Sequence, residues 1–254
     1  MTLTVTQALV LGAIHGPAEL LPVSSSAHVQ LVPRLLGWDH DALPADTRKA
    51  FEVGLHAGSL LVMLAAVPWP SPADALVLTT PGAIAGTVLE EPIEQRLGGT
   101  RGTAAGLVAG ALLMLAANGS NVERAENDAM RHRVHTRRAL RVGVAQALAL
   151  IPGLSRLGMA YSAGRLSGLD RREALEFGRS AGLPLTAGAV LLKTLRLRRT
   201  GLAPELRTPF AAGFAASAAS TALALPLRRR APIRTAAAWR VLLAAAALRQ
   251  NVPR

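Results

Sequence analysis

The sequence predicts an all-α integral membrane protein, a polytopic helical bundle. Half of its 254 residues are hydrophobic and the mean hydropathy is +0.31, which is more apolar than a soluble domain of this length needs. Aromatic residues amount to only 3%, and Ala, Leu, Val and Gly supply most of the apolar surface. Strand-forming aromatics are therefore scarce, and the small side chains favour closely packed helices.

The formal charge of +12 comes almost wholly from arginine, because the only lysines are Lys49 and Lys193. Codon usage explains the preference for arginine as well as function does. A basic excess suits nucleic acid, anionic lipid or a phosphate substrate. Nucleic-acid binding needs a contiguous basic face with stacking aromatics, whereas the arginines here gather between apolar runs, so we expect no nucleic-acid partner. The absence of cysteine excludes disulfides and thiolate metal sites.

The clearest apolar runs predict membrane helices. They cover about 51–69, 73–89, 103–118, 183–195, 209–227 and 235–248. Several are shorter than the ~20 residues that cross a bilayer upright, so we expect the helices to extend beyond them. The N-terminal residues lack the basic region and cleavage site of a signal peptide, so we expect them to belong to the mature fold.

Two other apolar regions are interrupted by proline. The first pairs 4–14 with 29–36, and the second pairs 139–151 with 157–167. Such short arms predict broken or re-entrant helices. Their irregular backbone is tolerated at membrane depth only where it is buried in protein or lines a water-filled cavity. The charged stretch 119–138 predicts a linker outside the membrane.

The two halves of the chain resemble each other. The segment "LLPVSSSAH" from Leu20 aligns with "LIPGLSRLG" from Leu150, and "EVGLHAG" from Glu52 aligns with "EFGRSAG" from Glu176. Two matches in the same order at nearly the same separation indicate an internal duplication. The prediction is one membrane domain over 1–254, with repeat one at about 1–118, the linker at 119–138 and repeat two at about 139–254.

Breaks at matching places in two repeats usually meet and form the site, so we expect 15–28 and 152–162 to share a polar pocket. His15 and Glu19 are four residues apart and share a helix face, where they could hold a divalent cation or pass a proton. The second helical histidine of a zinc-protease motif is missing. Ionisable residues inside a membrane segment are functional candidates by default, and a structural role for the pair is about equally open.

The serines of the first loop have two interpretations. Ser24, Ser25 and Ser26 follow a proline, and their hydroxyls could cap a new helix start. Alternatively, His28 lies three residues after Ser25 and could take its proton, which would make Ser25 a nucleophile. Spacing alone favours capping.

In the second loop, Ser155 and Arg156 lie at a predicted helix restart. Free backbone N–H groups and a guanidinium there form an anion site. The alternative is that Arg156 extends to the membrane surface. Together with the first loop, this pair indicates a phosphate ligand.

These motifs resemble the undecaprenyl-diphosphatase family of bacterial membrane enzymes, also known as bacitracin-resistance proteins. The family patterns E-G-x-T-E-F-L-P-V-S-S-T-G-H and P-G-x-S-R-S-G correspond to "HGPAELLPVSSSAH" and "PGLSRLG" here. The run "FEVGLHAGSLLVML" is similar to the family segment F-x-V-x-I-Q-L-G-S-x-L-A-V. The resemblance extends over nearly the whole chain.

The resemblance implies inverted repeats with two re-entrant hairpins in the bacterial plasma (inner) membrane. It implies hydrolysis of undecaprenyl diphosphate, a polyprenyl diphosphate lipid, to the monophosphate, with a divalent cation such as Mg²⁺ or Ca²⁺. The implied catalytic residues are Glu19, Ser25, His28 and Arg156; the implied substrate-binding residues are Ser24, Ser26, Ser155 and Arg156; the metal ligands are His15 and Glu19; and Glu52 and His56 line the pocket.

The sequence departs from the family pattern at four positions. His15 replaces a Glu, His56 a Gln, Ala27 a Gly and Leu157 a Ser. The change at position 15 removes two oxygen donors from a site for hard cations, so Mn²⁺ or Zn²⁺ should compete better there. The substitution also supports a rival from another class, a non-hydrolytic transporter that flips a polyprenyl phosphate.

Overall fold

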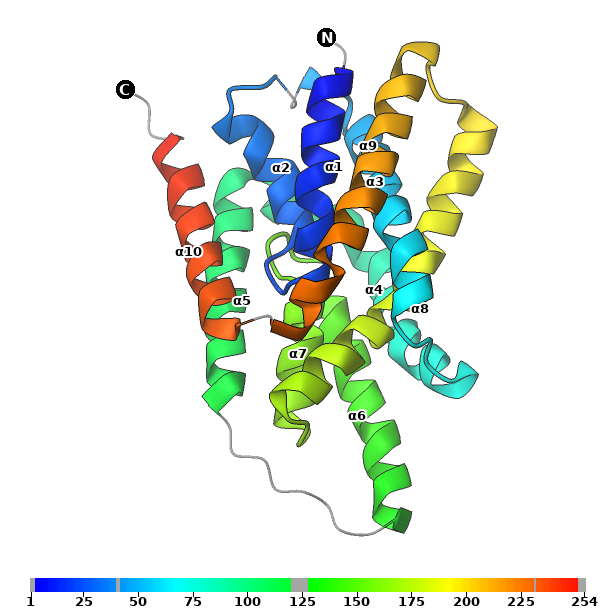
Figure 1. Cartoon of the computed structure of the whole chain (residues 1–254), viewed down its shortest axis with the longest axis vertical. Helices are drawn as coiled ribbons and strands as arrows, with labels where there is room; N and C mark the ends of the chain where they lie inside the picture. Colours follow the sequence, from blue (N-terminus) through cyan, green and yellow to red (C-terminus); the bar gives the residue numbers. More distant parts are fainter. Residues whose placement is uncertain (1–2, 40–41, 120–127, 231, 251–254) are drawn as a thin grey trace.

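The computed structural model describes residues 3–39, 42–119, 128–230 and 232–250. These residues form α-helices, one short 3-10 helix and no strand (Figure 1). The first half contains α1 (Val5–Leu20), α2 (Ser25–Leu35), α3 (Ala45–Ala66), α4 (Pro72–Leu97) and α5 (Thr100–Gly119). The second contains α6 (Asp128–Leu148), α7 (Arg156–Leu166), α8 (Arg171–Thr200), α9 (Pro204–Ala224), the 3-10 helix η2 (Leu225–Arg230) and α10 (Ile233–Gln250).

Four of these segments are long and apolar enough to cross a membrane. They are Ala45–Ala66, Pro72–Leu97, Thr100–Gly119 and Pro204–Arg228. The predicted all-α polytopic bundle is therefore confirmed. The apolar runs 183–195 and 235–248 lie inside α8 and α10, which are not among these four.

The predicted linker 119–138 is shorter than expected in the structure. Residues 120–127 lie outside the described residues, but α6 already begins at Asp128. Alanine, methionine and arginine, which favour helices, recur between 128 and 141 and allow the charged segment to continue the apolar part of α6.

Both predicted interruptions are present. Helix α1 ends at Leu20, Leu21 is extended, and Ser24 adopts a left-handed conformation with φ 72° before α2 begins. Between α6 and α7 the chain turns at Gly153, whose φ of 89° suits glycine. Ser155 then caps α7 by accepting a hydrogen bond from the N–H of Gly158 at 3.2 Å.

The two hairpins point toward each other from opposite ends of the molecule. Figure 1 shows α1–α2 reaching inward from the upper end and α6–α7 from the lower end. Helix contacts also occur in matched pairs: α1 packs on α9 as α6 packs on α4, and α3 packs on α9 as α8 packs on α4. This pairing supports the internal duplication and its inverted orientation, which stay predictions.

Small residues bring α1 against α9. A Cβ atom on Gly12 would lie 2.5 Å from the carbonyl oxygen of Gly213, and one on Gly16 would overlap Ser220 and the backbone of Thr221. Only glycine permits this approach, which is the packing mode expected for membrane helices. The close contact fixes the depth of the first broken helix.

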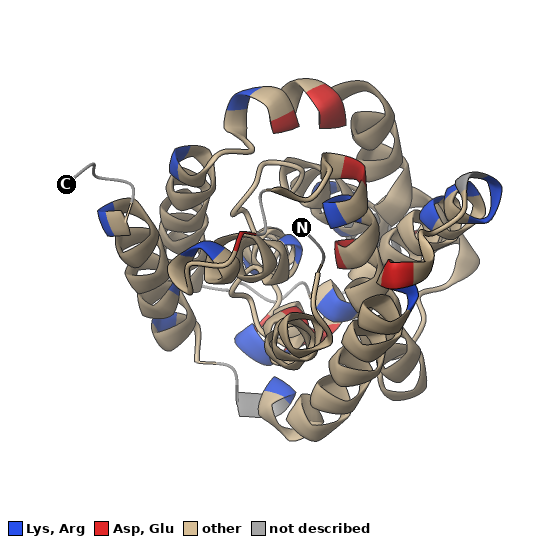
Figure 2. Ribbon diagram, turned by 90° about the horizontal axis from the view of Figure 1, so that it is seen from above, with Lys and Arg blue, Asp and Glu red and all other residues tan. Residues whose placement is uncertain are grey.

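Charged residues are spread over several helices. Viewed from above in Figure 2, basic positions appear at separate points around the bundle rather than in one patch, and acidic positions are fewer. No single charged surface patch among the described residues indicates a binding site, so we next consider the charged residues inside the bundle.

Candidate active site

The two helix breaks meet inside the bundle, where a single arginine of α10 joins them. Arg240 is fully buried and donates hydrogen bonds to the carbonyl oxygens of Pro22 at 3.3 Å and Gly153 at 2.8 Å. It also donates to the carbonyl oxygens of Leu107 at 3.1 Å and Gly106 at 3.4 Å in α5. The loops predicted to share a pocket are therefore neighbours.

Glu19 lies at the centre of a cluster of polar side chains. Its Oε2 accepts a hydrogen bond of 2.6 Å from the hydroxyl of Ser25, and its Oε1 accepts one of 3.0 Å from Nη2 of Arg156. The carboxylate is 10% exposed and the guanidinium 23% exposed. A carboxylate, a hydroxyl and a guanidinium from both broken helices thus form one hydrogen-bonded group.

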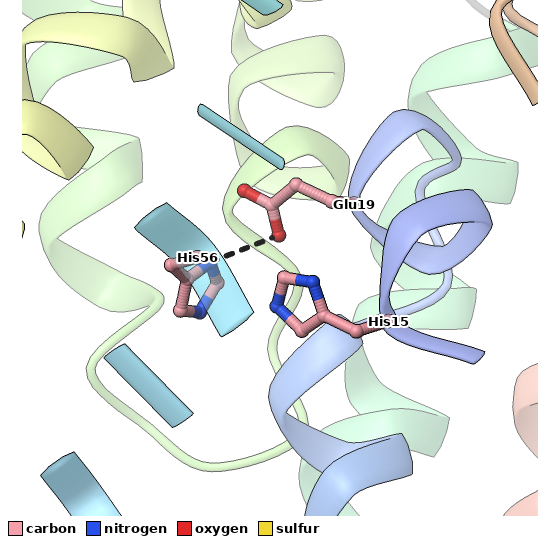
Figure 3. A group of neighbouring side chains, drawn as sticks. All are labelled: His15, Glu19 and His56. Atoms are coloured by element: carbon pink, nitrogen blue, oxygen red, sulfur yellow. Dashed lines mark ion pairs between the residues drawn. The ribbon is translucent and has the colours of Figure 1, made fainter. Parts of the chain in front are cut away.

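Two histidines lie next to Glu19 (Figure 3). Nδ1 of His56, on α3, is 3.4 Å from Oε2 of Glu19, and the rings of His15 and His56 meet edge to face with centroids 4.5 Å apart. One ligand atom each from His15, Glu19 and His56 lies within 4.8 Å of the others. These are side chains of the types that can ligate a metal ion.

The tautomer of His15 follows from its partner. The hydroxyl of Ser217 donates its proton to the carbonyl oxygen of Leu55 at 2.8 Å. It can then only accept from Nδ1 of His15, which lies 3.1 Å away. Nδ1 therefore carries the proton and Nε2 carries a lone pair. Among the described residues, this buried Nε2 has no hydrogen-bond partner.

The structure does not bring His28 to Ser25. Nδ1 of His28 lies 2.7 Å from the carbonyl oxygen of Ser24, to which it donates, and Nε2 accepts a hydrogen bond of 2.8 Å from the indole of Trp239. Both ring nitrogens are occupied, and the hydroxyl of Ser25 faces Glu19 instead. The predicted Ser25–His28 pair is thus replaced by a Ser25–Glu19 pair.

The remaining predicted residues make contacts of their own around this group. Ser24 precedes α2 but makes no capping bond, and its hydroxyl is 3.4 Å from that of Ser26. Ser155 uses its hydroxyl to cap α7. Oε1 of Glu52 lies 3.9 Å from Nε2 of His56, so Glu52 contacts the metal-ligating cluster from its far side.

Comparison with known proteins gives the family of the chain. The family model described as "Bacitracin resistance protein BacA" matches residues 8–68 and 72–246. The chain belongs to this family. The match spans both broken helices and all the pocket residues named above, so the BacA family assignment and the site concern the same part of the molecule.

Several relatives carry the name undecaprenyl-diphosphatase. The protein of Geobacter sulfurreducens is 36% identical over 89% of this chain and 89% of its own length. That of Gemmatimonas aurantiaca is 35% identical over 95% and 96%, and that of Thermomicrobium roseum is 34% identical over 88% of each. Together with the four candidate spans, the family identifies the chain as a membrane protein.

Two residues of this BacA member that contact the site were not predicted from the sequence. Arg240 interrupts the apolar run of α10, and an arginine at membrane depth was a signal that could have been used. Ser217 gave no such signal, because a serine among alanines is common in closely packed membrane helices. Only the fold brings it to His15, 202 residues away.

The donor set of the cluster does not match the cations that the resemblance implies. Mg²⁺ and Ca²⁺ prefer sites made of oxygen atoms. The cluster His15, Glu19 and His56 offers two imidazole nitrogens and one carboxylate. Imidazole suits Zn²⁺ and similar borderline metals better than hard cations.

Proposed function

We propose that this chain hydrolyses undecaprenyl diphosphate to undecaprenyl phosphate and inorganic phosphate in the bacterial inner membrane. The names of its relatives support this activity over the non-hydrolytic transporter. The observation that carries the proposal is the contact of Ser25 with Glu19 beside Arg156, where the two broken helices meet.

The Ser25–Glu19 contact supports a nucleophile and base. Glu19 would take the hydroxyl proton across the 2.6 Å hydrogen bond as Ser25 Oγ attacks the terminal phosphorus. The bond from phosphorus to the bridging oxygen breaks, and undecaprenyl phosphate leaves with the electron pair. Water then attacks the serine phosphate ester, the bond from phosphorus to Ser25 Oγ breaks, the proton on Glu19 returns to that oxygen, and inorganic phosphate leaves. A water activated by Glu19 at the same place would give the same products in one step.

Arg156 would neutralise the diphosphate. Its guanidinium projects into the pocket from the first residue of α7, where unpaired backbone N–H groups also attract anions. Ser24 and Ser26 add hydroxyl donors on the opposite loop, and Ser155 keeps the α7 terminus in place. Preorganised donors of this kind stabilise the charge that develops in phosphoryl transfer.

His28 would act as a positioning residue. It links the carbonyl group of Ser24 to Trp239 and so holds the backbone on which Ser25 lies. His15, Glu19 and His56 would hold a divalent cation. When bound, such a cation would add positive charge next to the diphosphate and favour attack on phosphorus.

Phosphate release by the full chain purified in detergent tests the proposal. Ser25→Ala should remove most of the release from undecaprenyl diphosphate, while Ser180→Ala should leave it unchanged. Ser180 is a suitable control because it is a partly exposed serine of α8 whose hydroxyl donates to the carbonyl oxygen of Pro68. Absence of phosphate release from the wild-type protein with every divalent cation would contradict the proposal.

A further inference from the structure

We infer that His15, Glu19 and His56 form a metal site that selects a borderline metal such as Zn²⁺ over Mg²⁺ and Ca²⁺. The catalytic use of this metal rests on the proposed function, but its binding does not. The inference adds His56 as a ligand and assigns the metal class from the donor atoms.

The three side chains come from two helices that hold them in place. His15 and Glu19 are one turn apart on α1, and His56 faces them from α3 (Figure 3). Their ligand atoms lie within 4.8 Å of one another. Zinc bonds to nitrogen and oxygen are about 2.0–2.2 Å long, so neighbouring ligands lie about 3–3.5 Å apart. Metal binding would draw the three atoms closer by side-chain rotation to reach that separation.

Nε2 of His15 is unprotonated and has no hydrogen-bond partner among the described residues, so it can bind a metal. Its Nδ1–H donates to Ser217, which is itself fixed by the carbonyl group of Leu55, so Nε2 presents a lone pair. His15 is 0% exposed, and Nε2 has no hydrogen-bond partner among the described residues. A buried, unpaired acceptor is costly unless something binds it. Metal-bound histidines characteristically donate their other N–H in this way.

His56 also has one nitrogen without a hydrogen-bond partner in the described part of the chain and one nitrogen that faces an acceptor. Its Nδ1 is buried 3.4 Å from Glu19 and makes no well-directed hydrogen bond to any described residue. Its Nε2 faces Glu52, with 3.9 Å between the nitrogen and Oε1. A carboxylate behind a histidine orients the ring and raises its basicity as a ligand. Each imidazole therefore has a buried nitrogen without a hydrogen-bond partner among the described residues, while its other nitrogen faces Ser217 in His15 and Glu52 in His56.

Glu19 can serve the metal and the hydroxyl together. Arg156 uses Oε1, and Ser25 uses one lone pair of Oε2. An ionised carboxylate offers about four acceptor positions, so one remains on the side of the histidines. Two neutral imidazoles and one carboxylate supply too few oxygen atoms for Mg²⁺ or Ca²⁺ but are a common set for zinc.

Metal competition on the wild-type protein is the first test. The full chain, purified in detergent and freed of metal with a chelator, is titrated with Co²⁺, whose visible absorption reports nitrogen ligands. Zn²⁺ should displace Co²⁺ at a concentration roughly 100-fold lower than Mg²⁺ or Ca²⁺ does. Equal displacement by Mg²⁺ and Zn²⁺, or no cobalt absorption at all, would overturn the inference. This test needs no variant to fold.

Three variants locate the site. His56→Gln should weaken Zn²⁺ binding by about 100-fold, and Glu52→Gln by about 10-fold. Glu176→Gln is the matched control for Glu52→Gln, because Glu176 pairs with Arg172 on the exposed face of α8, and it should bind Zn²⁺ as the wild type does. If His56→Gln binds Zn²⁺ as tightly as Glu176→Gln does, the site lies elsewhere.

Phosphate release from the same preparations separates this inference from the proposed function. Zinc binding without release would keep the metal site and reject the diphosphatase. Release with Mg²⁺ and no selective Zn²⁺ binding would keep the diphosphatase and reject the metal site.

Discussion

Trp239 and Arg240 are adjacent on α10, and both reach the broken helices. Trp239 donates its indole N–H to His28 in the first turn of α2, while Arg240 donates to the carbonyl groups of Pro22 and Gly153 in both loops. The last helix of the chain therefore holds together a site whose reactive groups lie on α1, α2 and α7. Trp239 and Arg240 should therefore affect activity without touching the substrate.

Replacement of Arg240 should destabilise the protein. Arg240→Met would remove the side-chain donor from the carbonyl oxygens of Pro22 and Gly153 in the two loops, and each unsatisfied buried group costs about 1–3 kcal/mol. We expect a lower unfolding temperature in detergent and a loss of phosphate release. Arg249→Met, which removes an exposed arginine from the same helix, should leave the unfolding temperature nearly unchanged. A wild-type unfolding temperature in Arg240→Met would show that the loops are held by other contacts.

The first-loop and second-loop residues could be predicted from sequence because their signals are local. Proline, serine runs and an arginine in an apolar region mark Ser25, Ser155 and Arg156 wherever the chain folds. The duplication further indicated that the two loops meet. The contact between Arg156 and Glu19, 137 residues apart, agrees with that expectation.

The partners of the histidines could not be predicted in the same way. His28 appeared to serve Ser25 because the two are close in sequence, but its ring bonds to Trp239, 211 residues away. His15 similarly depends on Ser217 of α9. Which nitrogen carries a proton follows from tertiary contacts, and these depend on the close packing of helices that spacing along the chain does not reveal.

Arg156 should affect both binding and turnover. Arg156→Ala removes the guanidinium next to Glu19, and loss of one such donor typically lowers kcat by about 100–1000-fold. KM for undecaprenyl diphosphate should also rise, and Arg156→Lys should restore activity only in part because lysine lacks the planar pair of donors. Steady-state phosphate release measures both constants. Arg172→Ala, on the exposed face of α8, is the control, and equal kinetics in the two alanine variants would remove Arg156 from the phosphate site.

Trp239 should act through His28. Trp239→Phe keeps a ring near His28 but removes the indole donor, a hydrogen bond worth about 1 kcal/mol. If that energy holds Ser25 in position, kcat should fall by roughly 5-fold while KM changes little. The half-exposed Trp69 provides the matching Trp69→Phe control, which should leave kcat unchanged. A larger effect on KM than on kcat would mean that Trp239 contacts the lipid instead.

The position of α1 against α9 should set the depth of the pocket. A Cβ on Gly16 would overlap the hydroxyl of Ser220 and the backbone of Thr221, so Gly16→Ala must push the helices apart. Overpacking of this kind costs about 1–3 kcal/mol, and the shift would also move Glu19, one turn further along α1. We expect a lower unfolding temperature together with reduced phosphate release.

The same substitution at Gly86 on α4 should not lower the unfolding temperature. A Cβ there meets nothing within 4 Å among the described residues. Alanine is the better helix former by roughly 0.5–1 kcal/mol, so Gly86→Ala should leave the protein equally or more stable and fully active. Because both variants add one methyl group to a helix, their difference isolates the contact between α1 and α9. Equal unfolding temperatures for the two variants would show that this contact yields to a methyl group and does not fix the site.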